Sequence, residues 1–262
     1  LPLIALQFHE VEFKFTFRSV LGLINASKDT TTITISDDLN VDFYINFIYL
    51  DTDERRRFAQ VSHEYLIEQI QVDEHDLTEN INLSFKHPIK ELIWVCQSSN
   101  YYEEATTSDY GSMENALYYQ DTNNIYKNNY FAYSIIDKSS ATTEYIGRDN
   151  KAIHYPFSDA EIFLNNVSRV EKQKTSYFAF YQHYLANHNL NNLVEHIYVY
   201  SFAIKPEETQ PSGTCNFSRL RSINLKLSNI DSESTNNTKI IIFAINYNVF
   251  NIMSGQGGLS YY

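Results

Sequence analysis

Apolar and polar residues alternate along residues 10–18 and again along residues 41–50. A period of two predicts strands, because successive side chains of a strand point to opposite faces of its sheet. The apolar positions are Val11, Phe13, Phe15 and Phe17 in the first segment, and Val41, Phe43, Ile45, Phe47 and Tyr49 in the second. The first segment is expected to be a half-buried antiparallel strand.

Apolar runs of strand length recur along the rest of the chain. Further strands are predicted at residues 31–35, 63–72, 81–85, 89–97, 160–164, 194–204, 215–227 and 239–249. The run at 89–97 is apolar throughout, which predicts a strand that is buried on both faces. About eight strands of this kind, separated by turn residues, predict an all-β sandwich or jelly roll.

Only one segment carries a clear helix signal. Asp51 precedes Glu54 by three residues, as in a capping box, so a short helix is expected through Arg57 to Gln60. Residues 98–157 are rich in Ser, Thr, Asn, Asp and Tyr and predict a long exposed loop, which is usually functional or flexible. A polar stretch without strands is expected at residues 165–192, and residues 253–258 are predicted to be a flexible tail.

Composition supports a packed β protein and argues against direct nucleic-acid binding. Hydrophobic residues make up 43% of the 262 positions and aromatic residues 15%. Tyr and Phe suit the pleated surfaces of sheets, and Tyr also suits protein–protein contacts. The net charge of −12 repels phosphate backbones. No apolar run approaches the roughly 20 residues of a membrane-spanning helix.

No constellation of residues predicts catalysis, a metal or a cofactor. The eight His are scattered without ligand spacing, and no His-Glu-x-x-His or Gly-x-Ser-x-Gly motif occurs. Cys96 lies in an apolar run, where it is expected to be a small core residue, and no base is recognisable beside Cys215. The protein is therefore predicted not to be an enzyme.

The arginine run at residues 55–57 has two interpretations. It could bind an anion, or it could form a short helix that pairs with nearby acids or with a neighbouring subunit, and the second is favoured. The chain opens on an apolar segment without an initiator Met, which predicts a fragment whose upstream half is not included; a processed terminus is the alternative.

Several long stretches carry a more specific signal than periodicity. They are Ala5–Val11, Leu50–Gln60, Ser62–Gln69, His87–Val95, Tyr200–Glu208, Gln210–Arg219, Asn246–Val249 and Ile252–Gly255. In this order they resemble the signature stretches of the major capsid proteins of nucleocytoplasmic large DNA viruses, a double jelly-roll family. The resemblance runs along the chain apart from residues 98–157 and 165–190.

Within these stretches, the family-signature residues are expected to have structural roles. They are Asp51, Asp53, Glu54, Arg55, Arg56, Arg57, His63, Glu64, Tyr65, Pro88, Glu91, Trp94, Pro206, Pro211, Gly213, Cys215, Asn216, Phe217 and Arg219.

The resemblance implies a fold and a division of the chain. The fold is an eight-stranded antiparallel jelly roll, the second of a double jelly roll, with one short helix and a long inserted loop. Residues 1–18 would be the last strand of an upstream first jelly roll, and residues 19–40 an inter-domain linker. Residues 41–262 would form the second jelly roll, with an exposed loop at about 98–157.

The resemblance also implies a structural function. Three polypeptides would form a pseudo-hexagonal capsomer that tiles an icosahedral shell, with minor capsid proteins beneath it. The internal viral membrane would be contacted at most indirectly. The expected location is the outer shell of the virion, assembled in the host cytoplasm. The alternatives are a single jelly-roll minor capsid protein and a lectin-like carbohydrate-binding module.

Overall fold

The computed structural model describes residues 1–19, 41–98, 130–131, 133, 155–186, 196–230 and 238–261. The predicted strand at 31–35 and most of the predicted loop at 98–157 lie outside these ranges.

The described residues form ten strands and a few short helices. The strands are β1 (His63–Asp76), β2 (Asn80–Asn82), β3 (Pro88–Ser98), β4 (Asp159–Leu164), β5 (Val167–Lys174), β6 (Ile197–Ser201), β7 (Cys215–Asn216), β8 (Ile223–Ser228), β9 (Thr238–Met253) and β10 (Gln256–Leu259). The helices are η1 (Leu3–Ala5), α2 (Thr52–Gln60), η3 (Tyr177–Tyr181), α5 (Gln182–Leu185) and η5 (Phe217–Arg219).

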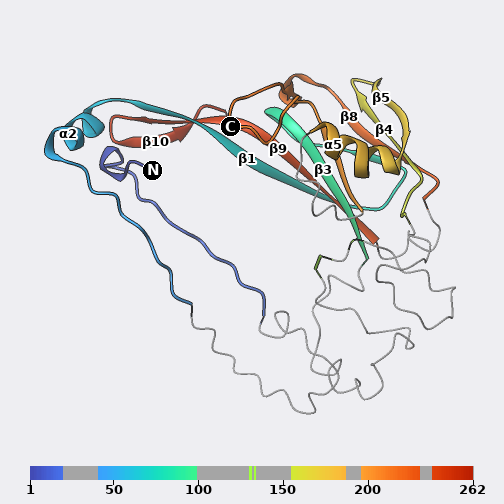
Figure 1. Cartoon of the computed structure of the whole chain (residues 1–262), viewed down its shortest axis with the longest axis horizontal. Coiled ribbons are helices and arrows are strands. Elements are labelled where there is room, and N and C mark those ends of the chain that lie inside the picture. Colours follow the sequence, from blue (N-terminus) through green and yellow to red (C-terminus); the bar gives the residue numbers. More distant parts are fainter. Residues whose placement is uncertain are drawn as a thin grey trace, which may run out of the picture.

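The strands form two antiparallel sheets that pack as a jelly roll (Figure 1). The six-stranded sheet has the order β1-β9-β3-β6, with β10 beside β9 and β7 beside β3, and the four-stranded sheet has the order β2-β8-β4-β5. Apart from the β4–β5 hairpin, successive strands of these two paths alternate between the sheets. That alternation is the jelly-roll connectivity. The two paths contain eight strands in the described residues, and β7 and β10 are short additions.

Aromatic residues fill the space between the sheets. Trp94 on β3 is fully buried, with its ring centroid 5.1 Å from Phe178 and 5.9 Å from Tyr198. Ile242 on β9 and Leu225 on β8 face the same core from the two sheets. Along β8 and the first half of β9 every second residue is buried, as strand geometry predicts.

The two longest strands extend beyond the sandwich as an arm. β1 pairs with β9 over its whole length, from His63 opposite Ile252 to Asp76 opposite Lys239. β3 pairs with β9 only as far as Asn246, so the last residues of β9 and the start of β1 project as a ribbon, and β10 joins this ribbon at its tip. Figure 1 shows this ribbon running out to α2 and β10, with the N-terminus beside them.

Two predicted strands are not strands in the structure. Residues 10–18 and 41–50 are extended and exposed, and within the described ranges neither hydrogen-bonds into a sheet. Their apolar faces do meet: the Phe43 ring lies 5.1 Å from Phe13 and 5.1 Å from Phe15. Alternation indicates which face a strand would bury, but a strand also needs a backbone partner, and neither sheet supplies one.

Four other predictions about individual elements were wrong. The stretch at 165–192 was expected to be polar loop, yet it contains β5 and the helical turns η3 and α5. The strand predicted over 215–227 is interrupted by η5, and the one at 81–85 shrinks to β2. The predicted flexible tail instead turns back at Gly255 and pairs as β10 with β9.

Candidate assembly surfaces

The signature residues around α2 build and close that helix. The Asp51 carboxylate accepts a hydrogen bond of 2.6 Å from the Thr52 amide, and the Val61 amide donates to the Arg57 carbonyl at the other end. Arg56 lies 3.8 Å from Asp53, the arginine–acid pairing that was predicted, but both side chains are exposed. Such a pair contributes little stability, and α2 buries no residue. Arg55 and Glu54 are also exposed.

The chain turns from α2 into β1 at a small aromatic stack. His63 Nε2 donates a hydrogen bond of 2.8 Å to the Phe58 carbonyl, and the two rings lie 5.3 Å apart. Tyr65 continues the stack, with its ring 6.2 Å from that of His63, whereas Glu64 is exposed. The signature residues of this region fix the direction in which the arm leaves the helix.

A second group of signature residues holds the segment 206–219 against the start of β3. Pro88 and Ile89 pair with Asn216 and Cys215 across the β3–β7 ladder. The Asn216 side chain caps η5 by accepting from the Ser218 amide at 3.1 Å. Phe217 is buried, and its ring meets Phe202 edge-on at 5.6 Å.

Gly213 lies in the same segment, at a position where no larger residue fits. Its φ is +150°, and a Cβ there would come within 2.8 Å of the Phe202 carbonyl oxygen. A side chain is therefore excluded by both the backbone conformation and the close approach. The remaining signature residues of the segment differ in exposure, since Pro206 is buried whereas Pro211 and Arg219 are exposed.

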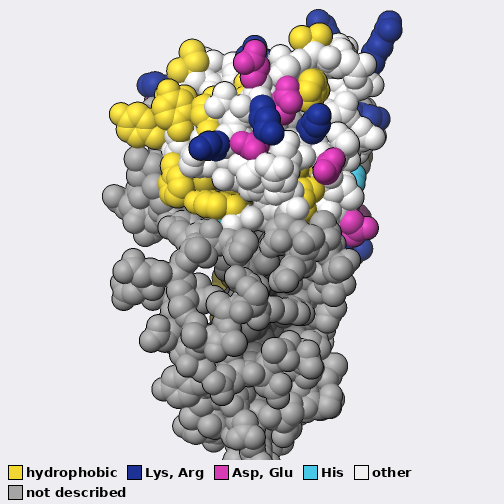
Figure 2. Space-filling view, turned by 90° about the vertical axis from the view of Figure 1, so that its right-hand side faces the viewer, with side chains coloured by type: hydrophobic (Ala, Val, Ile, Leu, Met, Phe, Trp, Pro, Cys, Tyr) yellow, Lys and Arg dark blue, Asp and Glu magenta, His cyan; other side chains and the backbone are white. Residues whose placement is uncertain are grey.

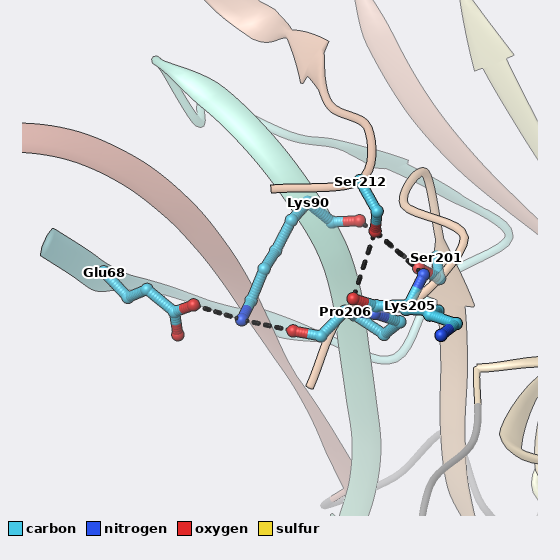
Figure 3. A network of polar contacts seen from close by, with 6 residues as sticks. All are labelled: Glu68, Lys90, Ser201, Lys205, Pro206 and Ser212. Atoms are coloured by element: carbon cyan, nitrogen blue, oxygen red, sulfur yellow. Dashed lines mark hydrogen bonds and ion pairs between the residues drawn. The ribbon is translucent and has the colours of Figure 1, made fainter. Parts of the chain in front are cut away.

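A buried ammonium connects this segment to the arm (Figure 3). Lys90 on β3 is almost fully buried and lies 2.6 Å from the half-exposed Glu68 carboxylate on β1. It also donates a hydrogen bond of 2.7 Å to the Pro206 carbonyl and lies 5.6 Å from the centre of the Tyr247 ring. A buried cation is tolerated only with such partners, so this cluster makes the packing of three segments interdependent.

Ser201 and Ser212 brace the turn beside Lys90. The Lys90 carbonyl accepts from the Phe202 amide at 2.8 Å, while Ser201 Oγ donates to the Ala203 carbonyl at 2.7 Å. Ser212 Oγ accepts from the Lys205 amide at 2.9 Å and donates to the Lys205 carbonyl at 3.1 Å. The turn is thereby held in one conformation next to the signature residue Glu91, which is itself buried.

The N-terminal residues dock on the tip of the arm. Ala5, Leu6 and Ile252 form a small buried cluster. The Phe8 amide donates to the Gly255 carbonyl at 2.9 Å, and the Gly257 amide lies 3.3 Å from His9 Nδ1. Residues 1–9 therefore contact the last hairpin, at the opposite end of the sequence.

The Lys90–Glu68 pair was missed by reasoning from the sequence. Its signal was present: a Lys-Glu dipeptide opens an otherwise apolar run, and a charged residue inside a buried strand is expected to be paired. The partner could not be identified from sequence, because Glu68 lies 22 residues earlier on a strand that is not adjacent to β3.

The structure places the two cysteines as core and near-core residues. Burial raises the pKa of the Cys96 thiol, which keeps it protonated and poorly nucleophilic. Burial also raises the pKa of Cys215.

Across the described ranges, no group of three His, Cys, Asp or Glu side chains could hold a metal ion. None of the helices in those ranges is long and apolar enough to cross a membrane.

Comparison with known families identifies the chain. Residues 54–258 match the model of the large eukaryotic DNA virus major capsid protein. The chain belongs to this family. Residues 1–51 match the model of the major capsid protein N-terminus, so the two matches adjoin at the start of α2.

Individual major capsid proteins align along the whole chain. The protein of Pyramimonas orientalis virus is 37% identical over 266 residues, covering 100% of this chain and 57% of its own length. That of Paramecium bursaria Chlorella virus 1 is 34% identical over 290 residues, covering 100% of this chain and 62% of its own. The chain thus spans about three-fifths of the length of these relatives.

Solved capsid structures share the fold. A crystal structure of PBCV-1 VP54, fitted into a reconstruction of the virophage Sputnik, superposes with a TM-score of 0.55 and 31% identity over 82% of this chain and 55% of that one. The Faustovirus major capsid protein matches with a TM-score of 0.50 over 78% of this chain and 36% of that one. At 13% identity, that second match shows the fold alone. The predicted jelly roll and the predicted family are both confirmed.

Proposed function

We propose that this chain is a structural subunit of the outer capsid shell of a large DNA virus, and that it is not an enzyme. The observation that carries the proposal is the family match: a model of major capsid proteins covers residues 54–258, and these residues form a jelly roll. The contacts described above lie within one chain. They are aromatic stacks, a close backbone approach at Gly213 and ion pairs, and they hold strands and turns together. Such features suit a subunit that must keep its shape within a shell.

The proposed partners are further copies of the chain. Three copies form a homotrimeric, pseudo-hexagonal capsomer that contacts neighbouring capsomers in an icosahedral shell, with minor capsid proteins beneath it. A net charge of −12 disfavours direct contact with the viral genome. The internal membrane is contacted at most indirectly, and assembly takes place in the host cytoplasm.

We also propose a two-part division of the chain with a later boundary than residue 41. The N-terminal family match extends through residue 51, and residues 41–50 lie outside both sheets. Residues 1–18 and 41–50 then belong to the first jelly roll, joined by residues 19–40, and the second begins at α2. A fragment that begins at residue 51 should unfold cooperatively, and broad, non-cooperative unfolding would contradict this boundary.

Oligomeric mass tests the central proposal. Sedimentation of the chain at increasing concentration should show a species of three times the 30.6 kDa monomer mass. Mass spectrometry of purified virions should find its peptides among the most abundant. A chain that stays monomeric at high concentration and is absent from virions would overturn the proposal.

A further inference from the structure

An open hollow of about 570 Å³ lies between the open end of the β4–β5 hairpin and the helical turn η3. The hairpin supplies Asp159, Lys172 and Lys174, and η3 supplies Tyr177 and Tyr181. Figure 2 views the end of the sandwich nearest β4 and β5, and shows charged and hydrophobic side chains next to one another on the described surface. Sites for small molecules commonly have a volume in this range and combine aromatic side chains with a few polar groups.

A β-bulge lies on the hairpin side of the hollow. The register of β4 with β5 shifts between Ala160 and Ile162, where β5 contains one more residue than β4. Bulges of this kind redirect side chains and are over-represented next to active sites. Lys174 lies opposite Asp159 in the ladder, and the Lys172 ammonium lies 3.6 Å from the Asp159 carboxylate. Both lysines therefore border the same carboxylate.

The other side of the hollow is formed by a π-helix. The Gln182 amide donates its hydrogen bond to the carbonyl of Tyr177, five residues earlier, where an α-helix would use the residue four earlier. Turns of this type are rare and occur frequently at functional sites. The rings of Tyr177 and Tyr181 lie 5.4 Å apart, with their planes inclined by 31°. A bulge and a π-helix thus flank one hollow, and departures from regular structure are expected at functional sites.

The two tyrosines form a well-supported aromatic surface. Tyr177 packs against the core, and its hydroxyl accepts a hydrogen bond of 2.7 Å from the amide of Gln182, which is buried. Tyr181 is 52% exposed, so a ligand can reach its ring. A tyrosine held in this way offers an apolar face and a polar edge.

The polar side chains of the hollow leave one positive charge unbalanced. Asp159 and Lys172 form an ion pair. Lys174 is exposed and has no ion-pair partner among the described residues. Gln173 and Ser176 add an amide and a hydroxyl, each of which can donate and accept hydrogen bonds. The hollow therefore combines an aromatic surface, neutral polar groups and one available ammonium.

This combination fits an acidic saccharide better than a peptide or a nucleotide. A sugar ring packs its C–H face on an aromatic ring and pairs its hydroxyls with amide, hydroxyl and carboxylate groups. The described lining contains no aliphatic side chain, so an apolar peptide side chain finds no pocket there. It contains no glycine either, so it offers no glycine-rich loop for a phosphate.

We propose that the hollow between the β4–β5 hairpin and η3 binds an acidic saccharide. Tyr177 and Tyr181 pack against the sugar ring, and the Lys174 ammonium pairs with its carboxylate. The net charge of −12 disfavours a polyanion, so the ligand carries one acidic group and not many. This inference goes beyond the proposed function and does not depend on it, because binding is measured on the chain itself.

A pair of matched probes tests the proposal. The methyl glycosides of glucuronic acid and glucose differ only at C6, where the first has a carboxylate and the second a hydroxymethyl group. In an NMR titration of the full chain, the glucuronide should bind with a Kd of about 1 mM or lower. The glucoside should bind at least about tenfold more weakly, because it lacks the charge-assisted hydrogen bond to Lys174.

Two substitutions in the hollow have matched controls outside it. Tyr181→Ala should weaken binding of the glucuronide at least about tenfold, and Lys174→Gln should lower its affinity to that of the glucoside. Tyr184→Ala and Lys226→Gln are the controls, because both side chains are exposed and neither lines the hollow. Both control variants should bind the glucuronide as the wild type does, and thermal unfolding checks that each variant is folded.

The outcomes that would overturn the proposal are distinct from those that test the subunit function. Absence of binding of both glycosides up to about 20 mM would exclude a saccharide site. Equal affinity for the two glycosides, or unchanged glucuronide binding in Lys174→Gln, would exclude recognition of the acidic group. An equal loss in Tyr181→Ala and Tyr184→Ala would exclude the hollow as the place of binding. The subunit function stands in each case, because oligomeric mass tests it separately.

Discussion

The ammonium nitrogen of Lys90 lies 2.6 Å from a carboxylate oxygen of Glu68, although strand β9 runs between the strands that carry them. The lysine side chain spans β9 close to the Tyr247 ring and ends at the Pro206 carbonyl as well. One buried cation thus joins the arm, the centre of the six-stranded sheet and the 206–219 segment.

Replacing Lys90 by Met should therefore destabilise the protein. The Met side chain keeps much of the packing volume but leaves the Pro206 carbonyl without its hydrogen bond, which costs about 1–3 kcal/mol for a buried group. The midpoint of urea unfolding at pH 7 measures the loss. The matched control is Glu68→Gln, which should cost less because that side chain is half exposed and its amide oxygen still accepts from Lys90. A Lys90→Met variant as stable as the wild type would contradict this role.

Trp94 should be the most sensitive core position among the signature residues. Its ring is fully buried between Phe178 and Tyr198, so Trp94→Ala leaves a cavity and should lower the free energy of unfolding by about 3–5 kcal/mol. Calorimetry of Trp94→Ala and Trp94→Phe measures this, with the smaller loss expected for Phe. Tyr184→Ala is the control, because Tyr184 is 65% exposed and its removal should change stability by no more than about 0.5 kcal/mol.

Gly255→Ala should release the N-terminal residues from the arm while the core stays intact. Gly255 has a φ of +82°, and a Cβ there would lie 2.5 Å from the Phe8 ring. Hydrogen exchange should show faster exchange of the Phe8 amide, which donates to the Gly255 carbonyl, and unchanged protection in β3. Met253→Ala, at a neighbouring side chain that is 66% exposed, should leave the Phe8 amide protected. Equal protection of Phe8 in Gly255→Ala would show that residues 1–9 do not depend on this close approach.

His196 should make the protein sensitive to acid. Burial lowers the pKa of its imidazole below the usual value of about 6.5. Between the lowered folded pKa and about 6.5, the unfolded chain binds more protons than the folded chain, so stability falls as the pH drops through this window. Above about pH 6.5 the imidazole is neutral in both the folded and the unfolded chain, so it no longer lowers the free energy of unfolding. Melting temperatures at pH 7.5, 6 and 5 measure the slope.

His196→Asn is the variant that isolates this effect. Asn does not titrate and tolerates the positive φ of 73° found at this residue. The variant should lose less stability than the wild type between pH 7.5 and 5. An identical loss in both proteins would assign the acid sensitivity to other groups.

Elements whose signal is local were predicted well. The helix after Asp51 follows from a side chain that caps the next amide. β1 and β9 follow from their apolar periodicity, and β3 from a continuous apolar run. β5 was missed because its sequence, with Arg169, Glu171 and Lys172, is largely charged. It is the edge strand of the four-stranded sheet, and a charged edge is a common device against edge-to-edge association.

The candidate assembly surfaces were predictable only in part. Trp94 and Gly213 stand in motifs that resemble the family, and the structure gives each a packing role. The apolar residues on the outer side of the six-stranded sheet were predicted only as parts of separate strands at 63–72, 89–97 and 239–249. That Ile70 and Val72 lie beside Ile245 and Phe243 follows only from the register of β1 with β9.

The sequence by itself determined the strand-rich fold class, the helix at Asp51 and the family, because these depend on side chains close together in the chain or on motifs in a fixed order. Only the tertiary structure decided which strands are neighbours and which of two apolar faces is buried. It also decided that Lys90 forms an ion pair with Glu68 across β9. Periodicity predicts which residues are buried but not which distant segment covers them. Sheet order and register join residues far apart in sequence, and they are set by how all the strands pack together.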